Sequence, residues 1–290
     1  MNRRQVLKAG LLGAAALVLS PGFARESEGT DATARLAQLE RRHGGRLGVA
    51  IIDTADGRQA MHRADERFLM CSTFKLLAVA ATLARVDRGA ERLDRRIVFA
   101  PSALLAYAPV TRQHVGEPGM RVGELCRAAI TVSDNTAANL LLASMGGPSA
   151  VTSFVRSIGD PVTRLDRIEP GLNVGSPGDM RDTTTPRAMV ATMRQMLLND
   201  VLAEGSRRQL IAWLRACETG REQLRAGFPR GWVAGDKTGS GSHGETNDVA
   251  VVWPPGRKPL LVAAYYADSP ASATERKRVL AEVGRIAASM

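Results

Sequence analysis

The sequence contains few aromatic side chains: Phe, Trp and Tyr make up 4% of its 290 residues. Proteins that bind single-stranded nucleic acid combine a basic groove with aromatic side chains on which the bases stack. The formal net charge of +10 supplies basic residues, but they are spread along the chain and form no stripe. We therefore expect no nucleic-acid partner.

Cysteine and histidine are also scarce, and none of them has the spacing of metal ligands. The H-E-x-x-H pattern of zinc hydrolases is missing, and so is the G-x-S-x-G pattern of many serine hydrolases. These absences disfavour a zinc enzyme and a Ser-His-Asp hydrolase, and we expect neither a metal nor a cofactor. The three cysteines are an odd number, so at least one thiol is expected to be free.

The first 24 residues have the pattern of an export signal. Basic residues at positions 3, 4 and 8 precede an apolar run over 9–19, and small residues follow at the two positions that a signal peptidase reads. The run is too short to span a membrane. The paired arginines resemble a twin-arginine signal, and an ordinary Sec signal remains the alternative. The leader has no cysteine for a lipid anchor. We expect a periplasmic protein without a membrane anchor.

Patterns typical of strands occur near both ends of the remaining chain. Residues 46–63 read as two strands around an Asp56-Gly57 turn, after a helix that Asp31 would cap. Three further strands are expected over 231–239, 248–255 and 259–267, followed by a closing helix over 272–289. The middle of the chain reads as helices separated by loops, the longest of which covers residues 164–186.

These patterns predict an α+β fold of the αβα sandwich type. One antiparallel sheet would be built from both chain ends, with helices packed on it. We expect a single catalytic unit over 25–290, with a sheet lobe at about 25–68 and 225–290 and a helical lobe at about 69–224. A cleft between the lobes would be the natural ligand site.

The stretch "MCSTFK", Met70 to Lys75, contains the first candidate for chemistry. Ser72 and Lys75 are three residues apart at a helix start, so they share one face. A serine needs an adjacent base to act as a nucleophile, and a lysine held out of water can lose its proton near neutral pH. The N–H of Ser72 could also bind developing negative charge. We interpret Cys71 as a packed thiol. An S-x-x-K pattern alone is more often ordinary helix surface.

Three further motifs each have an ordinary structural explanation. Ser133-Asp134-Asn135 suits a helix N-cap, "KTGSG" at 237–241 suits the end of a strand, and Glu169 in "EPGLN" could be a solvated loop carboxylate. Together, the order S-x-x-K, S-D-N, E-x-x-L-N and K-T-G resembles the class A serine β-lactamases along essentially the whole mature chain. Arg167 and Asp182, which bracket the long loop, match the family's omega-loop ion pair.

The resemblance implies hydrolysis of β-lactam antibiotics through a serine acyl-enzyme, and hence antibiotic resistance. Ser72 would attack the β-lactam carbonyl, and the N–H groups of Ser72 and Ser240 would form the oxyanion hole. Either Lys75 or Glu169, the latter through a water, would take the serine proton. Ser133 would pass a proton to the leaving ring nitrogen, with Lys237 nearby.

The resemblance also implies how the substrate and the hydrolytic water are held. Glu169 and Asn173 would position the water that hydrolyses the acyl-enzyme. The substrate-binding residues would be Tyr107 at the cleft mouth, Asn135 for the side-chain amide, Lys237, Thr238 and Ser240 for the carboxylate, and Arg225 as an added cation. We expect a monomer that acts on small β-lactam substrates.

Two departures from the family bear on the thiols. Val79 and Gly241 occupy the positions where some relatives carry the partner of a disulfide. We therefore expect Cys71, Cys126 and Cys217 all to be free. The substrate spectrum stays open.

Two other functions would share part of this pattern. A penicillin-binding D,D-peptidase would contain S-x-x-K, S-D-N and K-T-G, but it does not need Glu169 with Asn173 to hydrolyse a β-lactam adduct. A non-catalytic β-lactam or peptidoglycan sensor normally has a membrane segment or a fused domain, and we find neither in this sequence.

Overall fold

The computed structural model describes residues 21–176 and 178–290, with side chains from residue 30 onward. The predicted export signal lies outside the described residues, apart from 21–24 at the start of helix α1 (Pro21–His43). None of the described helices is both long enough and apolar enough to cross a membrane.

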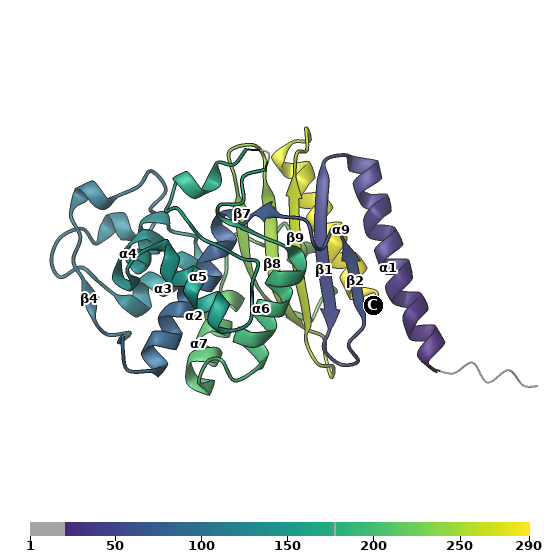
Figure 1. Cartoon of the computed structure of the whole chain (residues 1–290), viewed down its shortest axis with the longest axis horizontal. Helices are drawn as coiled ribbons and strands as arrows, with labels where there is room; N and C mark the ends of the chain where they lie inside the picture. Colours follow the sequence, from purple (N-terminus) through teal and green to yellow (C-terminus); the bar gives the residue numbers. More distant parts are fainter. Residues whose placement is uncertain (1–20, 177) are drawn as a thin grey trace, which may run out of the picture.

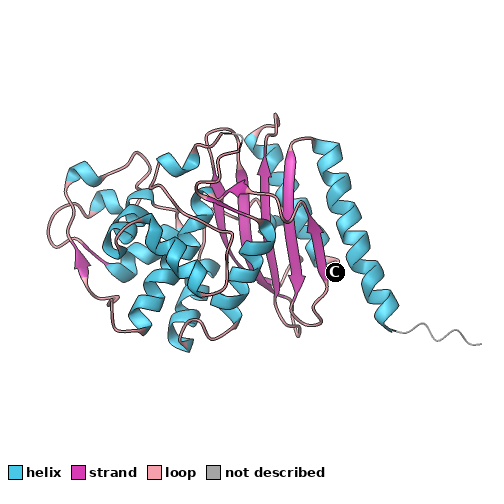
Figure 2. Cartoon of the chain, in the orientation of Figure 1, coloured by secondary structure: helices cyan, strands magenta, loops and turns pink. Residues whose placement is uncertain are grey.

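Five antiparallel strands form the main sheet, in the order β2-β1-β9-β8-β7 (Figures 1 and 2). Their bounds are β1 Arg46–Asp53, β2 Gln59–His62, β7 Val233–Ser240, β8 Thr246–Trp253 and β9 Leu260–Ala267. Strand β1 pairs with β9 along its whole length, from Arg46 opposite Ala267 to Asp53 opposite Leu260. The prediction that one sheet is built from both chain ends is therefore confirmed.

Both faces of the sheet are buried, because successive side chains of a strand point in opposite directions. Leu47, Val49 and Ile51 pack in one apolar cluster with residues of α1 and of α9 (Ala273–Ala288). Ala50 and Ile52 point into a second cluster, which includes the helices of the middle of the chain. The sheet therefore lies between two helical layers, as the sandwich prediction requires.

Helix α1 begins earlier than expected. Asp31 does not cap it but lies inside it, 3.9 Å from Arg35 in the next turn. The residues before Asp31 include Ala24, Arg25 and Glu26, which are good helix formers and contain no strong stop signal. The helix therefore extends upstream of the residue that the capping rule favoured.

The middle of the chain forms a group of helices, most of which contact α2. Their bounds are α2 Phe74–Asp87, α3 Val122–Thr131, α4 Asn135–Met145, α5 Pro148–Ser157, α6 Pro186–Leu198, α7 Glu204–Arg215 and the short α8 Leu224–Gly227. Every residue of α2 from Phe74 to Ala84 is buried, which explains its apolar composition on all sides. Helix α6 lies in the range expected for the helical lobe, yet it packs on β1 and β9.

Short elements complete the fold and carry the loops of the site. They are the two-residue strands β3 Phe68–Leu69, β4 Arg96–Ile97, β5 Met120–Arg121 and β6 Thr183–Thr184, and the 3-10 helices η1 Cys71–Thr73, η2 Pro101–Ala103, η3 Thr111–Gln113 and η4 Gly171–Asn173. The three cysteines are buried and free, as expected.

The long loop that carries Glu169 is fastened at its ends by Asp182. The buried Asp182 carboxylate accepts hydrogen bonds from Nε of Arg167 (2.5 Å), from the Arg167 N–H (2.9 Å) and from the Asp166 N–H (2.7 Å). The backbone carbonyl of Asp182 accepts from the N–H of Met70, two residues before Ser72. One residue therefore ties the loop to itself and to the nucleophile segment.

We predict that Asp182→Ala destabilises the protein more than Arg167→Ser. The first change leaves the partly buried guanidinium of Arg167 and two backbone N–H groups without their acceptor, at a cost of about 3 kcal/mol. The second change keeps both backbone hydrogen bonds to the carboxylate. Urea unfolding measures both, and Arg187→Ser, which breaks an exposed ion pair with Asp65, should change stability by less than about 1 kcal/mol. Equal losses for the two loop variants would contradict this assignment.

Candidate active site

A cavity of about 400 Å³ lies where η1, the loop before α4, η4, β7 and α9 meet. It is lined by Ser72, Tyr107, Ser133, Asn135, Asn173, Thr219, Gln223, Thr238, Gly239, Ser240 and Lys277. Seven of the site residues expected from the sequence are among them. Lys75, Glu169 and Lys237 are buried in the wall beneath. The sequence motifs therefore meet in one place, although they come from distant parts of the chain.

The hydroxyl of Ser72 contacts both candidate bases. Nζ of Lys75 donates to Ser72 Oγ at 2.9 Å, and Ser72 Oγ donates to Oε1 of Glu169 at 3.2 Å. These distances are within the reach that proton transfer requires. Lys75 and Glu169 also pair with each other at 3.0 Å, and both side chains are fully buried. The serine is therefore held at the centre of a buried acid-base pair.

Lys75 is the most highly connected side chain of the site. Its ammonium group also donates to the Ser133 carbonyl (2.9 Å), to Ser133 Oγ (3.2 Å) and to Asn135 Oδ1 (2.5 Å). The pKa of Lys75 is lowered to about 8, mainly because burial removes the hydration of the charged form; Glu169 opposes this shift, and the nearby Lys237 adds to it. An appreciable fraction of the amine is therefore neutral near pH 7.

Cys71 differs from Ser72 in both exposure and ionisation. Its side chain is buried, and burial raises the pKa of its thiol well above the ordinary value. A thiol nucleophile must ionise to react, and this one stays protonated. The geometry agrees with the interpretation of Cys71 as a packed thiol.

Ser133 lies between the two buried lysines. Nζ of Lys75 and Nζ of Lys237 both donate to its Oγ, at 3.2 and 3.1 Å. The two donors occupy the lone pairs of this oxygen, which leaves the hydroxyl proton for a third partner in the cavity. Burial also lowers the pKa of Lys237, which keeps this ammonium a ready source of protons.

Asp134 fixes the backbone on which Ser133 and Asn135 lie. Its carboxylate caps helix α4 by accepting from the Ala137 N–H, and it also accepts from the N–H groups of Val110 and Thr111. The predicted N-cap is therefore confirmed, with Asp134 as the capping residue. Ser133 itself has a left-handed backbone (φ +59°), which turns its hydroxyl toward the two lysines.

Glu169 is held by two asparagines. Asn173 Nδ2 donates to Glu169 Oε2 at 2.5 Å, and Asn173 Oδ1 has no hydrogen-bond partner among the described residues. Asn139, which the sequence analysis missed, pairs with both the N–H and the carbonyl of Glu169 at 2.9 Å. A signal did exist, because Asn139 is four residues after Asn135 and shares its helix face.

Strand β7 passes very close to the nucleophile. A Cβ at Gly239 would lie 2.8 Å from the Met70 carbonyl oxygen and 3.2 Å from the Ser72 nitrogen. Only glycine allows the backbone before Ser240 to approach the Ser72 N–H so closely. This proximity is what an oxyanion hole made of the Ser72 and Ser240 N–H groups needs.

Arg225 does not take the expected position. Its guanidinium pairs with the buried Asp236 of β7 and donates to the Leu214 carbonyl at 2.8 Å, and it is not among the residues that line the cavity. A buried carboxylate needs a cationic partner, and Asp236 provides a stronger site for this arginine than the open cleft does. Arg225 therefore does not line the cavity where we expected a cation for the substrate.

Three lining residues had no recognisable signal in the sequence. Thr219 exchanges a hydrogen bond of 2.6 Å with Thr238 Oγ1, and Gln223 is 3% exposed. Both lie in a loop after α7, whose path the sequence pattern does not specify. Lys277 lies in the closing helix that was predicted over 272–289, where no motif marks it.

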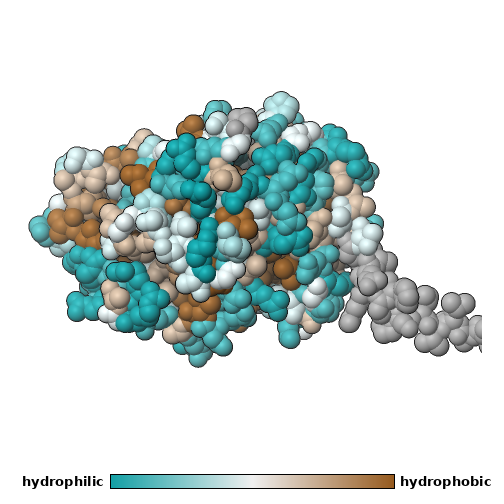
Figure 3. All heavy atoms as spheres, in the orientation of Figure 1, coloured by the Kyte–Doolittle hydropathy of each residue, from teal (hydrophilic) through white to brown (hydrophobic). Residues whose placement is uncertain are grey.

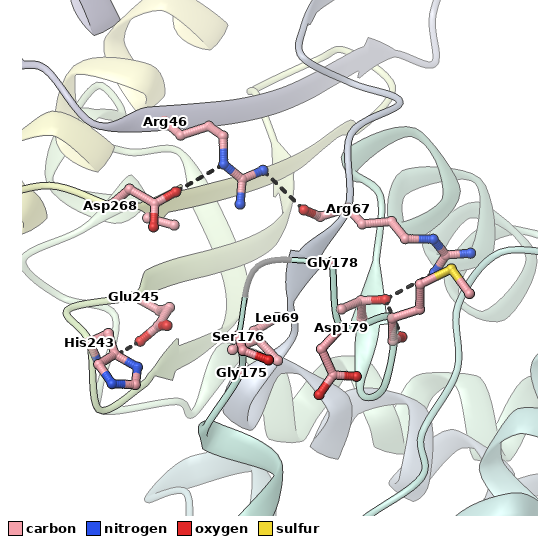
Figure 4. A pocket seen from close by; sticks show the side chains of 13 residues that line it. Arg46, Arg67, Leu69, Gly175, Ser176, Gly178, Asp179, His243, Glu245 and Asp268 are labelled. Atoms are coloured by element: carbon pink, nitrogen blue, oxygen red, sulfur yellow. Dashed lines mark hydrogen bonds and ion pairs between the residues drawn. The ribbon is translucent and has the colours of Figure 1, made fainter.

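A larger cavity, of about 620 Å³, lies on the other side of the long loop (Figure 4). Charged side chains in its lining are already engaged, since Arg46 pairs with Asp268, and Arg67 donates to the Thr183 hydroxyl and to the Val162 carbonyl. Ser242 Oγ donates to the Asn173 carbonyl at 3.2 Å, which links the turn after β7 to the loop. The described hydroxyls that line this cavity, those of Ser176 and Thr183, contact no base, so the smaller cavity is the better candidate for catalysis.

We predict that Gly239→Ala slows the acylation of Ser72 by a β-lactam about 100-fold, because the added methyl group pushes Ser240 away from the Ser72 N–H. Stopped-flow kinetics measures the rate. Gly205→Ala is the matched control, because a Cβ at that helical position meets no atom within 4 Å. A parental rate in Gly239→Ala would exclude this oxyanion hole.

Comparisons with known proteins agree with this geometry. A model of the β-lactamase enzyme family matches residues 31–289. β-Lactamase CTX-M-25 of Escherichia coli is 47% identical over 287 residues, which cover 99% of this chain and 98% of the relative. β-Lactamase OXY-2 of Klebsiella oxytoca is 46% identical over 277 residues, which cover 95% and 94% of the two chains.

Solved structures give the same result. An ancestral (GNCA) class A β-lactamase is 61% identical and superimposes with a TM-score of 0.86, covering 88% of this chain and 98% of that one. A putative class A β-lactamase, PenP of Rhodopseudomonas palustris, is 54% identical with a TM-score of 0.87, covering 89% and 98%. The chain belongs to the β-lactamase enzyme family and has the fold of its class A members.

Proposed function

We propose that this protein hydrolyses β-lactam antibiotics through an acyl-enzyme on Ser72 and thereby confers antibiotic resistance. The observation that carries the proposal is the position of the Ser72 hydroxyl, which contacts both Lys75 Nζ and Glu169 Oε1. The second oxygen of Glu169 is held by Asn173. One carboxylate can therefore act both on the Ser72 hydroxyl and on a water beside Asn173.

In the acylation step, Ser72 Oγ attacks the β-lactam carbonyl as its proton leaves. Neutral Lys75 can accept this proton, and Glu169 can accept it directly or through a water. The negative charge that develops on the carbonyl oxygen is bound by the N–H groups of Ser72 and Ser240. The C–N bond of the four-membered ring then breaks, and the ring nitrogen needs a proton.

Ser133 is the group placed to supply that proton. Its Oγ accepts from Lys75 and Lys237, so its own proton is free to pass to the ring nitrogen. The lysines can then restore the proton to the serine. The product of this step is an ester of Ser72 with the ring nitrogen protonated.

Deacylation needs a water that is both aimed and deprotonated. Asn173 Oδ1 can accept a hydrogen bond from such a water, while Glu169 takes its proton. Transfer of the hydroxide to the ester carbonyl releases Ser72 and returns the proton to it. A D,D-peptidase does not need this pair to hydrolyse a β-lactam adduct, so the Asn173–Glu169 contact favours a β-lactamase.

The remaining lining residues would bind the substrate. Asn135 Oδ1 is used by Lys75, which leaves its amide N–H groups for the substrate side-chain amide. Thr238 and Ser240, with Lys237 behind them, would hold the substrate carboxylate. The phenol of Tyr107 donates to the Val132 carbonyl at 3.1 Å, which orients the half-exposed ring at the mouth of the cleft.

The proposal includes a monomer that is exported to the periplasm. The leader pattern over 1–24 supports export, whether by the twin-arginine or the Sec route. On the face drawn in Figure 3, apolar residues are scattered among polar ones, as expected of a chain that does not need a partner subunit there.

We predict that Glu169→Ala is acylated but fails to turn over, because Lys75 can serve as a base for acylation and no second base is available for the water. The loss of general-base catalysis is worth roughly 10²- to 10⁴-fold in deacylation. Stopped-flow kinetics with a penicillin should show a burst of about one equivalent, and mass spectrometry should show the adduct. Ser72→Ala is the control and should form no adduct. Parental turnover in Glu169→Ala would contradict the proposed function.

We also predict how acylation of Glu169→Ala depends on pH. Only the neutral form of Lys75 accepts a proton, so the rate should rise with pH and level off above the pKa of Lys75. In the parent this pKa is about 8, and Glu169 raises it. Removing Glu169 should therefore move the midpoint below about 8. Acylation of this variant that does not change with pH would exclude Lys75 as the base.

A further inference from the structure

A charged groove lies away from the catalytic cavity, between helices α1 and α9. The two helices pack against each other on one face of the main sheet (Figure 1). The groove between them has a volume of about 190 Å³, and its polar lining consists of Arg35, Gln38, Arg42, Glu282 and Arg285. In the described structure these residues are separate from those that line the catalytic cavity. The proposed function therefore leaves this groove without a role.

The two helices run antiparallel, which brings the three arginines of the groove together. Arg35 Nη1 donates to Ser289 Oγ at 2.7 Å near the end of α9, whereas Arg42 lies beside Glu282, two turns earlier in α9. Residues seven apart in a helix share one face and lie about 10 Å apart along its axis. Arg285 comes from α9 between these two contacts, so three guanidiniums border one groove.

The acids near these arginines are few and distant. Arg42 and Arg285 lie 3.5 and 3.7 Å from the same carboxylate, that of Glu282, and Arg35 lies 3.9 Å from Asp31. These distances are longer than a normal hydrogen bond, which is 2.7–3.2 Å for N–H to oxygen. Because each guanidinium has five N–H donors, one carboxylate shared by two of them leaves most of their donors to solvent.

Helix dipoles explain only part of this arrangement. Arg42 and Arg285 lie in the last turns of α1 and α9, where the partial negative charge of a helix C-terminus favours a cation in any protein. Arg35 lies outside the last turn of α1, so the same effect does not account for it. The dipoles also do not explain why all three side chains meet at one groove.

The charge of the groove matches a doubly charged anion. Three arginines and one glutamate give its lining a net charge of +2. A phosphate monoester carries about −1.5 to −2 at pH 7, whereas a carboxylate carries only −1. The planar guanidinium also presents its N–H groups in a fork that fits two phosphate oxygens at once. Phosphate is therefore the ligand chemistry that this groove fits best.

We propose that the groove between α1 and α9 binds a phosphate group through the guanidiniums of Arg35, Arg42 and Arg285. The phosphate replaces Glu282 as the shared partner of Arg42 and Arg285. This exchange costs little, because Arg42 and Glu282 are 55% and 34% exposed and water screens their attraction. The amide of Gln38, between Arg35 and Arg42 on the same face of α1, can donate to the same ligand.

The phosphate can come from two sources that offer the same oxygens, a free phosphate in solution or the headgroup of an anionic phospholipid. The groove is open at the surface, because Arg35 and Arg285 are 40% and 53% exposed, so both sources can reach it. Binding there does not involve Ser72, and the inference does not rest on the proposed function.

Nuclear magnetic resonance of the arginine Nε–H groups tests the proposal with inorganic phosphate at pH 7.5. A constant ionic strength of about 0.15 M screens non-specific attraction. We expect the signals of Arg35, Arg42 and Arg285 to shift together with a single Kd. Arg42→Gln and Arg285→Gln should each weaken phosphate binding about fivefold. Glu282→Gln should strengthen it roughly two- to threefold, because the competing carboxylate is gone.

Sedimentation with lipid vesicles identifies the source of the phosphate. If a headgroup is the ligand, vesicles that contain phosphatidic acid should carry the protein with them, and vesicles of phosphatidylcholine alone should not. Binding of inorganic phosphate without sedimentation supports the site with a free phosphate as its ligand. Sedimentation that Arg42→Gln and Arg285→Gln reduce supports the site with a lipid ligand.

Arg208→Gln is the matched control, because it removes the same charge from a side chain that is 70% exposed on helix α7. It should change neither phosphate binding nor sedimentation, and urea unfolding should show that every variant is folded. The inference is overturned if the groove arginines do not respond to phosphate and the protein does not sediment with phosphatidic acid. It is equally overturned if Arg208→Gln weakens binding as much as Arg42→Gln does, since the attraction would then belong to the whole surface.

Discussion

The chemistry of this protein depends on one buried ion pair, between Lys75 and Glu169. Burial removes the hydration of Lys75, which favours its neutral form, and the adjacent Glu169 carboxylate favours its charged form. The balance brings the pKa of Lys75 to about 8. A fully solvated lysine would be too rarely neutral to act as a base, and a buried lysine without Glu169 would lose its proton more readily still. The contact between these two groups therefore helps to set the protonation state of Lys75.

The surrounding structure maintains this contact. Helix α2 is buried along its first eleven residues, so Lys75 cannot move outward. Glu169 lies in a loop, and it is held by hydrogen bonds with Asn139 and Asn173 and by the contacts of Asp182 at the ends of the loop. The backbone carbonyl of Asp182 also accepts a hydrogen bond from the Met70 N–H, so the same residue anchors the loop and the segment that carries the nucleophile. Rigid elements position the lysine, whereas polar contacts position the acid.

Much of this could be predicted from the sequence, because its signals are local. Strands with continuous apolar runs, the turn at Asp56-Gly57 and the cap at Asp134 each follow from neighbouring residues. The order of the four motifs S-x-x-K, S-D-N, E-x-x-L-N and K-T-G along the chain identified most of the residues that surround Ser72. The partners of Arg225 and Lys277 could not be predicted in this way, because the sequence does not show which acidic residue lies beside each cation in the fold. Asp236 of β7 holds Arg225 of α8, and only the three-dimensional structure reveals this pair.

The depth of an ion pair determines what it can do at this site. The buried pair of Lys75 and Glu169 cannot be exchanged for solvent or ligand without a large penalty, which suits groups that must keep a fixed geometry while protons move. An exposed pair such as Lys277 and Glu222 is weak because water screens it, so it could not hold two bases at a fixed distance from a nucleophile. Burial of Lys75 and Glu169 therefore supplies both the lowered pKa of the lysine and the fixed position of the Ser72 hydroxyl between the two groups.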